Sequence, residues 1–308
     1  MRYKDNNPIN TIETIMNHFF DFGLTFKEFI SNNDDAYPSI ALLCRELGVY
    51  VNGKGSNILF ARASAYAEFY ERFYNNTYFR FNNFYPSIYN INVNSYNYLS
   101  KEETIGNIKE FILNNYGNEE CNDEKINVIY DYVKTECVNN KVPTIFFKNS
   151  KYQIFKVPTI VADYFIGTNG MASGNSYEEA YMQAFSEIIE RKAIRDIDKE
   201  NINIKKVPIE DIKSNSDRLY NKIIEIQNST NYKIKCITLE QNYNYPVVAI
   251  FFIDTKNLTY NFKFGAHWNI YFALERCMSE ILQGCNFDDK IQLKDICSTL
   301  INNKTESF

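Results

Sequence analysis

The chain has 308 residues, of which 45% are hydrophobic and 23% charged, a composition typical of a globular protein with a sizeable core. Its formal net charge is −5 and no basic tract occurs, which argues against a nucleic-acid-binding surface. No apolar stretch is long enough for a signal peptide or a membrane span, so we expect a cytoplasmic protein. An acidic protein can still bind a nucleotide when a metal ion bridges its carboxylates to the phosphates.

Taken in chain order, the apolar pattern predicts a mixed α/β (α+β) protein rich in antiparallel sheet. Helical spacing occurs at 11–22, 60–75, 103–115, 124–138, 177–195, 217–227 and 269–282. Strand signals occur at 142–147, 152–161, 232–240, 247–254 and 258–264, the last three spaced as a meander, and a short strand leads into a glycine turn within 48–55. We expect one domain over 1–290, either single or built from two packed halves with a break near 140–150, and a polar tail over 291–308.

Several familiar chemistries are poorly supported. The segment from Gly48 to Lys54 fits GxxxxGK, but Gly55 replaces the magnesium-binding Ser or Thr of a P-loop. His18 and His267 are the only histidines, and nothing near them resembles a nucleophile elbow. We interpret His267 as a hydrogen-bonded turn residue. The seven scattered cysteines form no CxxC pair, so we expect reduced thiols and no zinc site.

The stretch from Gly167 to Arg195 contains the most candidate functional side chains. The helix that follows its loop of small residues places four polar side chains on one side: Glu179, Gln183, Glu187 and Glu190. Two carboxylates three residues apart destabilise a helix unless a cation neutralises them, and divalent ions take carboxylate oxygens. The alternative is that Ser176 and Glu179 form a capping box and the carboxylate row is a solvated face.

An internal echo strengthens the metal interpretation. SAYAEFYERF, QAFSEIIERK and RCMSEILQGC are three helical segments in which acidic or amide residues recur after small residues. We interpret them as one packed helical layer that presents acidic groups to a shared site. A buried cluster of this kind would be strongly unfavourable alone, whereas two Mg²⁺ ions bridging to a polyphosphate would offset the repulsion, with Arg191 and Arg276 on phosphate oxygens. The Asn-, Tyr- and Phe-rich stretch over 76–99 is either a long ordered loop or the lining of a peptide groove.

Three segments together resemble the nucleotide-binding motifs of the YcaO superfamily, in order and spacing. They are GKGSNILFARASAYAEFYERF, TNGMASGNSYEEAYMQAFSEIIER and FGAHWNIYFALERCMSEILQG. The aromatic run after the first motif and the FGAH…ALER…LQG ending resemble the stand-alone bacterial branch. The resemblance covers Lys4 to Asn286 and implies the YcaO-type ATP-binding fold, with antiparallel-rich sheets packed against helices that carry E-x-x-E-R motifs.

The resemblance also implies an enzyme that depends on ATP and Mg²⁺ and acts on backbone amides of a ribosomally made peptide or protein. A side chain or a sulfide donor adds to the amide carbonyl, and the amide oxygen takes the γ-phosphate of ATP and leaves as phosphate, with ADP as the other product. The result is azoline-forming cyclodehydration or thioamidation. The protein would contribute positioning and electrostatic stabilisation of the phosphoryl transfer.

Site residues follow from the positions that match the family motifs. The implied metal ligands are Glu68, Glu71, Glu179, Glu187 and Glu190. The implied nucleotide contacts are Lys4, Thr11, Asn175, Arg191 and Arg276, together with Ala172 or Ser173 in the loop. Glu187, Glu190, Arg191 and Arg276 are the implied catalytic residues.

The chain departs from the family pattern at its end, because Phe308 follows soon after the third motif. We therefore expect a partner protein that binds a leader peptide or donates sulfur, or a chain completed by another part, and we expect a homodimer. The alternative function is a non-catalytic, ATP-binding accessory protein that supports methylthiolation of a ribosomal protein. A purely structural protein with solvated acidic helices is the third interpretation, and it predicts no nucleotide binding.

Overall fold

The computed structural model describes residues 4–74, 96–97, 100–118, 121–135, 142–148, 153–158, 161, 168–197, 203–240 and 245–283. The chain divides into two compact units, one formed by 1–71 with 170–308 and one formed by 72–169. Residues 140–150 thus belong to the second unit. Nearly all of the aromatic stretch over 76–99, and the whole predicted tail over 291–308, lie outside the described residues.

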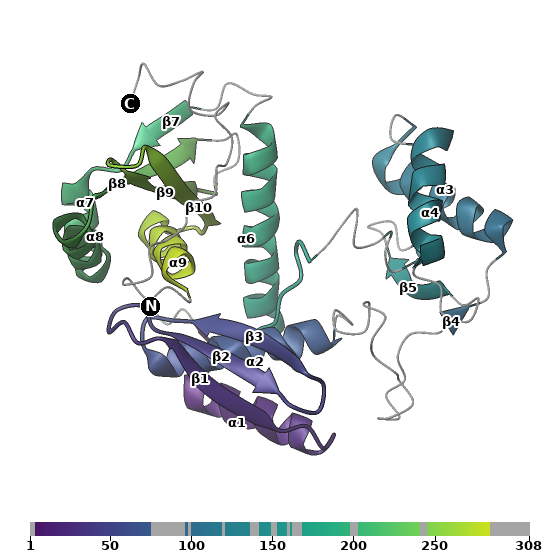
Figure 1. The fold of residues 1–308 in the computed structure, drawn as a ribbon, viewed down its shortest axis with the longest axis horizontal. Helices are drawn as coiled ribbons and strands as arrows, with labels where there is room; N and C mark the ends of the chain where they lie inside the picture. The colour runs from purple at the N-terminus through teal and green to yellow at the C-terminus, as the bar shows by residue number, and fades with distance from the viewer. Residues whose placement is uncertain are drawn as a thin grey trace. The chain divides into compact units, whose positions relative to one another are not determined.

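The first unit begins with a three-stranded antiparallel sheet and two helices (Figure 1). Its elements are α1 (Pro8–Phe20), β1 (Phe26–Asn32), β2 (Ser39–Cys44), β3 (Val49–Lys54) and α2 (Ile58–Tyr74), and the strand order is β1-β2-β3. Asn7 caps α1 and Pro8 starts it, three residues before the helical spacing that the sequence showed from Thr11. Phe19 of α1 and Phe69 of α2 meet edge to face at 5.0 Å, and Phe26 of β1 lies 4.8 Å from Phe69. Both helices therefore cover the same face of the sheet.

The predicted glycine turn at the end of this sheet is wrong, because Gly53 is a strand residue paired with Ile40. The turn lies before β3, where Gly48 has a φ of +64°. Gly53 is needed for a different reason, the close approach of α2. A Cβ atom at Gly53 would stand 2.1 Å from the carbonyl oxygen of Ala61 and 2.2 Å from the backbone nitrogen of Ala65. The small residues that predicted close packing in α2 thus allow its backbone to lie on the strand.

The second sheet of the first unit has four antiparallel strands in the order β10-β9-β8-β7. They are β7 (Asn203–Lys206), β8 (Tyr232–Glu240), β9 (Val247–Asp254) and β10 (Thr259–Ala266). The structure confirms the predicted meander of β8, β9 and β10, with Leu239 paired to Val247 at one end. The sequence analysis missed β1 and β7 because short strands with mixed polarity lack clear alternation. It missed β2 because a short apolar run does not by itself distinguish a strand from a buried helix segment.

Helices cover both faces of this sheet. They are α6 (Tyr177–Asp196) on one side, and α7 (Ile209–Asn215), α8 (Asp217–Ser229) and α9 (Ile270–Leu282) on the other. Alternate residues of a strand point to opposite faces. Ala249 of β9 packs with Ile189 of α6, and its neighbour Ile250 packs with Ala273 of α9. The predicted single layer of three helices is therefore wrong, since α6 and α9 lie on opposite faces of the sheet.

Among its described residues, the second unit has two helices and a small antiparallel sheet. Its described elements are β4 (Tyr96–Asn97), α3 (Lys101–Tyr116), α4 (Asp123–Thr135), β5 (Val142–Lys148) and β6 (Ile154–Pro158), with strand order β4-β5-β6. Ser100 and Glu103 form a complete capping box at α3. Ile108, Phe111 and Ile126 join the helices in a core of their own.

The class of the fold is mixed α/β with antiparallel sheets, as predicted. The four described cysteines, Cys44, Cys121, Cys236 and Cys277, are free thiols. Among the described helices, none combines the length and apolarity that a membrane span requires.

Candidate functional site

Helix α6 begins at a cluster of polar contacts between distant segments. Ser176 caps the helix, and its hydroxyl accepts from the backbone N–H of Glu179 at 3.1 Å. The predicted capping box is only half made. The Glu179 carboxylate instead accepts from Lys4 Nζ at 2.6 Å and from the backbone N–H of Asp5 at 3.2 Å. The N-terminal segment of the chain is thereby tied to the first turn of α6.

Helix α1 reaches the same point. The hydroxyl of Thr11 donates to Asn175 Oδ1 at 2.6 Å, and Asn175 Nδ2 donates to Glu179 Oε2 at 3.1 Å. The structure therefore brings together four of the predicted site residues, Lys4, Thr11, Asn175 and Glu179, although more than 160 residues separate the two halves of this group in sequence.

The Lys4–Glu179 ion pair keeps a nearly buried carboxylate ionised. The Glu179 side chain is 9% exposed and that of Lys4 is 30% exposed. Burial disfavours the ionised carboxylate, but the hydrogen bond and charge of Lys4 outweigh it and lower the pKa of Glu179. An ionised carboxylate with a displaceable cationic partner is a suitable oxygen ligand for a divalent cation.

Farther along α6, Glu187 and Glu190 have raised pKa values, the opposite of Glu179. Burial, followed by the charge of Glu280, raises the pKa of Glu190 to about 7. Burial also raises the pKa of Glu187. Arg191 contacts both carboxylates only loosely, at 3.8 Å from Glu187 and 3.6 Å from Glu190, and its own side chain is 52% exposed. Burial thus costs the ionised forms of these two carboxylates more than the nearby arginines offset, and a bound cation would favour the ionised forms.

Helix α9 adds charge to this cluster from the opposite face of the sheet. Arg276 lowers the pKa values of Glu187 and Glu190, whereas Glu280 raises them. Glu280 in turn pairs with Lys54 of β3 at 2.9 Å. The charged groups of α6 and α9 act on one another past the edge strand β10. The backbone of this strand comes close to α9 at Gly265, since a Cβ atom there would stand 2.7 Å from Cys277 Sγ. Acidic groups of α6 and α9 thus influence one another's pKa, and their common site stays a prediction.

A backbone amide orients Glu187. The N–H of Gly170 donates to Glu187 Oε2 at 3.2 Å. Gly170 has a φ of +75°, the left-handed region that favours glycine, and a Cβ added there would stand 2.8 Å from Ile188 Cδ1. The loop that leads into α6 thus aims the amide at the carboxylate, and this arrangement requires glycine.

We expect Gly170→Ala to weaken Mg²⁺ binding in the presence of ATP about tenfold, because a residue that orients a metal ligand typically contributes that much. A Mg²⁺ titration at saturating ATP measures the effect. Gly23→Ala is the matched control, since Gly23 has a φ of +73° and a Cβ there would meet nothing within 4 Å. Both variants pay a left-handed strain of about 1–2 kcal/mol. An equal loss of Mg²⁺ affinity in the two variants would show that strain, not the contact to Glu187, is responsible.

The remaining predicted residues lie on the loop and on α2. The hydroxyl of Ser173 donates to the backbone carbonyl of Ala67 at 2.9 Å, which ties the loop to α2 next to Glu68 and Glu71. Both carboxylates are half-buried. Among the described residues, no three Asp, Glu, His or Cys side chains converge closely enough to hold a metal ion in this structure. The donor set has the right chemistry for Mg²⁺, and the α2 and α6 carboxylates remain predicted ligands.

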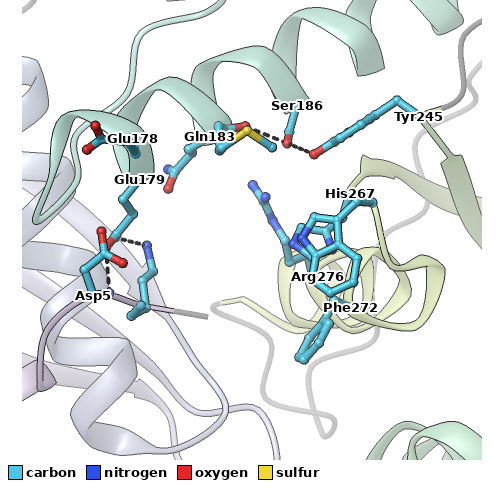
Figure 2. Close-up of a pocket in the computed structure, with 12 residues that line it drawn as sticks. Asp5, Glu178, Glu179, Gln183, Ser186, Tyr245, His267, Phe272 and Arg276 are labelled. Atoms are coloured by element: carbon cyan, nitrogen blue, oxygen red, sulfur yellow. Dashed lines mark hydrogen bonds and ion pairs between the residues drawn. The ribbon is translucent and has the colours of Figure 1, made fainter. Parts of the chain in front are cut away.

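A pocket adjoins the cluster between α6, α9 and the N-terminal segment (Figure 2). Of the predicted site residues, Lys4, Glu179 and Arg276 line it. The sequence analysis missed its apolar walls, formed by Met182, Tyr245, Trp268 and Phe272. His267 is a turn residue, as interpreted, since its Nδ1 accepts from the N–H of Asn269 at 3.0 Å, but it also lines the pocket. The FGAHWN segment could have signalled this wall, because it leads directly into the Arg276 helix.

Comparison with known proteins identifies the family. The model of the YcaO cyclodehydratase family, described as ATP- and Mg²⁺-binding, matches residues 52–298. An uncharacterised protein of Haemophilus influenzae is 28% identical over 254 residues, which are 78% of this chain and 41% of that protein. The ribosomal protein S12 methylthiotransferase accessory factor YcaO of Escherichia coli is 29% identical over 144 residues, 47% of this chain and 24% of that protein. The chain thus matches less than half the length of either relative.

Solved structures agree on the fold. YcaO from Methanopyrus kandleri, bound with AMPPCP and Mg²⁺, superposes with a TM-score of 0.55 at 16% identity, covering 95% of this chain and 71% of that one. A heterocyclase in complex with substrate and cofactor superposes with a TM-score of 0.57 at 14% identity, covering 97% of this chain and 42% of that one. With the family model matched over most of the sequence, and with its motif residues gathered around α6, this chain belongs to the YcaO family, whose cofactors are ATP and Mg²⁺.

Proposed function

We propose that this chain binds ATP with Mg²⁺ and activates a backbone amide of a peptide or protein by phosphorylating the amide oxygen. The observation that carries the proposal is the pair of carboxylates on α6, Glu187 and Glu190, whose pKa values are raised by burial in a YcaO-family motif. Metal-free, this pair is costly to ionise. A bound divalent cation supplies the missing positive charge and also the electrostatic stabilisation that phosphoryl transfer needs.

The residues divide the work by their position. Glu187 and Glu190 on α6, with Glu68 and Glu71 on α2, are assigned to Mg²⁺. Lys4, Thr11, Ser173 and Asn175 are assigned to the nucleotide, and Arg191 and Arg276 to its phosphates. Glu179 is assigned to Mg²⁺ as well, and it would exchange its ion pair with Lys4 for the metal while Lys4 would turn to the nucleotide phosphates. This ion pair would then couple metal binding to ATP binding.

The reaction follows from this assignment. A nucleophile, either a side chain of the peptide or a sulfide, adds to the amide carbon. The amide oxygen attacks the γ-phosphate, the bond to the β-phosphate oxygen breaks and ADP leaves. Elimination of the phosphorylated oxygen as inorganic phosphate yields an azoline or a thioamide. The chain's part is to hold the reactants in line and to neutralise charge on the transferring phosphoryl group.

The similarity to the accessory factor of Escherichia coli favours a second candidate. In that case the chain binds ATP but leaves its partner unmodified, and it assists methylthiolation of a ribosomal protein. A leader-binding or sulfur-donating partner protein belongs to the first candidate, and a stable ribosomal or methylthiotransferase partner belongs to the second.

Mass spectrometry of peptides encoded beside the gene, incubated with the chain, ATP and Mg²⁺, tests the first candidate. We expect ADP release together with loss of one water from the peptide, or replacement of one oxygen by sulfur when sulfide is supplied. Ribosomal protein S12 is the comparison substrate. ATP binding without any mass change, combined with retention of S12 on the chain, would contradict the catalytic proposal and support the accessory role.

A further inference from the structure

The pocket beside the carboxylate cluster is built for a ligand that the acidic motifs do not account for. It has a volume of about 390 Å³, within the range of small-molecule and side-chain binding sites. Helix α6 forms one wall, with Met182 and Ser186, and the other is formed by Trp268, just before α9, and by Phe272 in its first turn. Figure 2 shows Gln183 and Arg276 extending from the two helices into the space between them.

The walls expose large apolar side chains. Trp268 is 50% exposed, Met182 41% and Phe272 38%. Tyr245 is held in place by a 2.6 Å hydrogen bond between its hydroxyl and that of Ser186, and its ring meets Phe185 edge to face. Apolar surface gathered around a concavity, with a few polar groups at one end, is the usual lining of a binding site.

Most of the assigned nucleotide contacts lie outside this pocket. Thr11, Ser173 and Asn175 do not line it, and they lie with the loop and the start of α1. Lys4, Glu179 and Arg276 do line it. Two residues assigned to the nucleotide, Lys4 and Arg276, thus line the pocket, whereas its apolar walls carry no assigned nucleotide contact and leave room for a second reactant.

The charged residues that line the pocket limit the kind of side chain that it can bind. Lys4 is already paired with Glu179. Asp5 and Glu178 are exposed and place negative charge on one side of the pocket, whereas Arg276 places positive charge on the α9 side, where the phosphates are assigned. An acidic side chain beside Asp5 and Glu178 would be repelled by them, and desolvating it against Trp268 and Phe272 would add a further cost. A neutral apolar side chain fits the walls and avoids this repulsion.

We propose that this pocket binds an apolar side chain, aliphatic or aromatic, of the peptide substrate, next to the amide that is modified. Arg276 and Gln183 then face the backbone amide of the bound residue. The proposal rests on the proposed function for the presence of a peptide substrate, and it adds the class of residue that the chain selects.

The chain carries its own reporter of occupancy. Trp268 is its single tryptophan, so its fluorescence reports on this pocket alone. The probes are N-acetyl-leucinamide, N-acetyl-phenylalaninamide and N-acetyl-aspartamide, titrated into the full chain with and without ATP and Mg²⁺. We expect saturable changes in Trp268 emission with the leucine and phenylalanine amides, and binding of the aspartate amide at least about tenfold weaker.

Variants locate the binding. Met182→Gln should weaken binding of the leucine amide about tenfold, the order expected for removing an apolar wall contact. Tyr181→Gln is the matched control, because Tyr181 is an exposed aromatic on the same helix that does not line the pocket, and it should leave the titration unchanged. Equal effects of the two variants would overturn the proposal.

A titration with adenosine tests whether the pocket binds the peptide substrate or the nucleobase of ATP. Displacement of the amide by adenosine, with the same emission change on adding ATP, would overturn the proposal and leave the proposed function intact. Binding of ATP with Mg²⁺ but of no amide would do the same. Failure of ATP to bind at all would instead contradict the proposed function on which the inference rests.

Discussion

Replacing Glu190 by glutamine is expected to stabilise the metal-free protein above pH 7 and to remove its response to Mg²⁺. Burial and the nearby Glu280 raise the pKa of Glu190 to about 7, and its side chain is only 19% exposed. Keeping this carboxylate ionised in the folded chain therefore costs up to about 3 kcal/mol of the free energy of unfolding. Glutamine keeps the shape without the charge, and it cannot serve as an anionic ligand.

The raised pKa of Glu190 determines whether stability rises or falls with pH. Because the folded pKa lies above the unfolded value, the unfolded chain binds fewer protons than the folded chain between these two values, and stability falls as the pH rises through this window. The contribution of Glu190 is fully present below the unfolded pKa and is lost by about pH 7. The difference in unfolding temperature between wild type and Glu190→Gln should therefore be small at acidic pH, grow as the pH rises from 4.5 to about 7, and stay near its maximum above that.

Glu178→Gln is the matched control, because Glu178 is an exposed carboxylate on the same helix. Its unfolding temperature should change little, since exposed substitutions usually alter the free energy of unfolding by less than about 0.5 kcal/mol. A destabilised Glu190→Gln protein above pH 7, or one that still binds ATP more tightly with Mg²⁺ than without it, would contradict the assignment of Glu190.

Removing the positive charge of Arg276 should lower the free energy of unfolding, which is the opposite of the effect expected for Glu190→Gln. Arg276 lowers the pKa values of Glu187, Glu190 and Glu280. In Arg276→Met these carboxylates lose a nearby positive charge, and we expect the free energy of unfolding above pH 7 to fall by about 2–3 kcal/mol, because a buried charge is left with less compensation. ATP affinity should fall about 10- to 100-fold with the lost charge-assisted contact.

Arg191→Met separates the two effects. Arg191 is 52% exposed and contacts the carboxylates only at 3.6 and 3.8 Å, so its loss should cost less than about 1 kcal/mol of stability. ATP affinity should still fall, because both arginines are assigned to the phosphates. Calorimetric ATP titration and urea unfolding of the two variants provide the comparison. A larger stability loss in Arg191→Met than in Arg276→Met would show that the cluster is not organised around Arg276.

The sequence predicted the helices and strands that have regular apolar repeats, and it singled out the charged residues that recur at helical spacing. The meander β8–β10 and helices α6 and α9 were within reach because their apolar repeats are regular. Strands β1 and β2 were not, since half of β1 is polar, Glu28 among it, and its pairing with Arg62 of α2 is invisible without the fold. The role of Gly53 was equally hidden, because it depends on how closely α2 approaches.

The candidate site divides in the same way. The carboxylates and arginines were predictable because charged residues at helical spacing need an explanation. The ion pair between Lys4 and Glu179 joins residues 175 positions apart, and no local pattern indicates it. Trp268 and Phe272 read as ordinary core residues, and only their exposure at the pocket distinguishes them. The opposite placement of α6 and α9 followed from alternation in β9, a strand whose residues are almost all buried.

The central claim is that α6 supplies the carboxylates of an ATP–Mg²⁺ site. Calorimetric titration of ATP into wild type and Glu187→Gln, each with and without Mg²⁺, tests it most directly. We predict that Mg²⁺ strengthens ATP binding to wild type and has little effect in Glu187→Gln, whose side chain still accepts the hydrogen bond from Gly170 but lacks the charge. No heat from wild type, or equally tight Mg²⁺-dependent binding by Glu187→Gln, would contradict the claim.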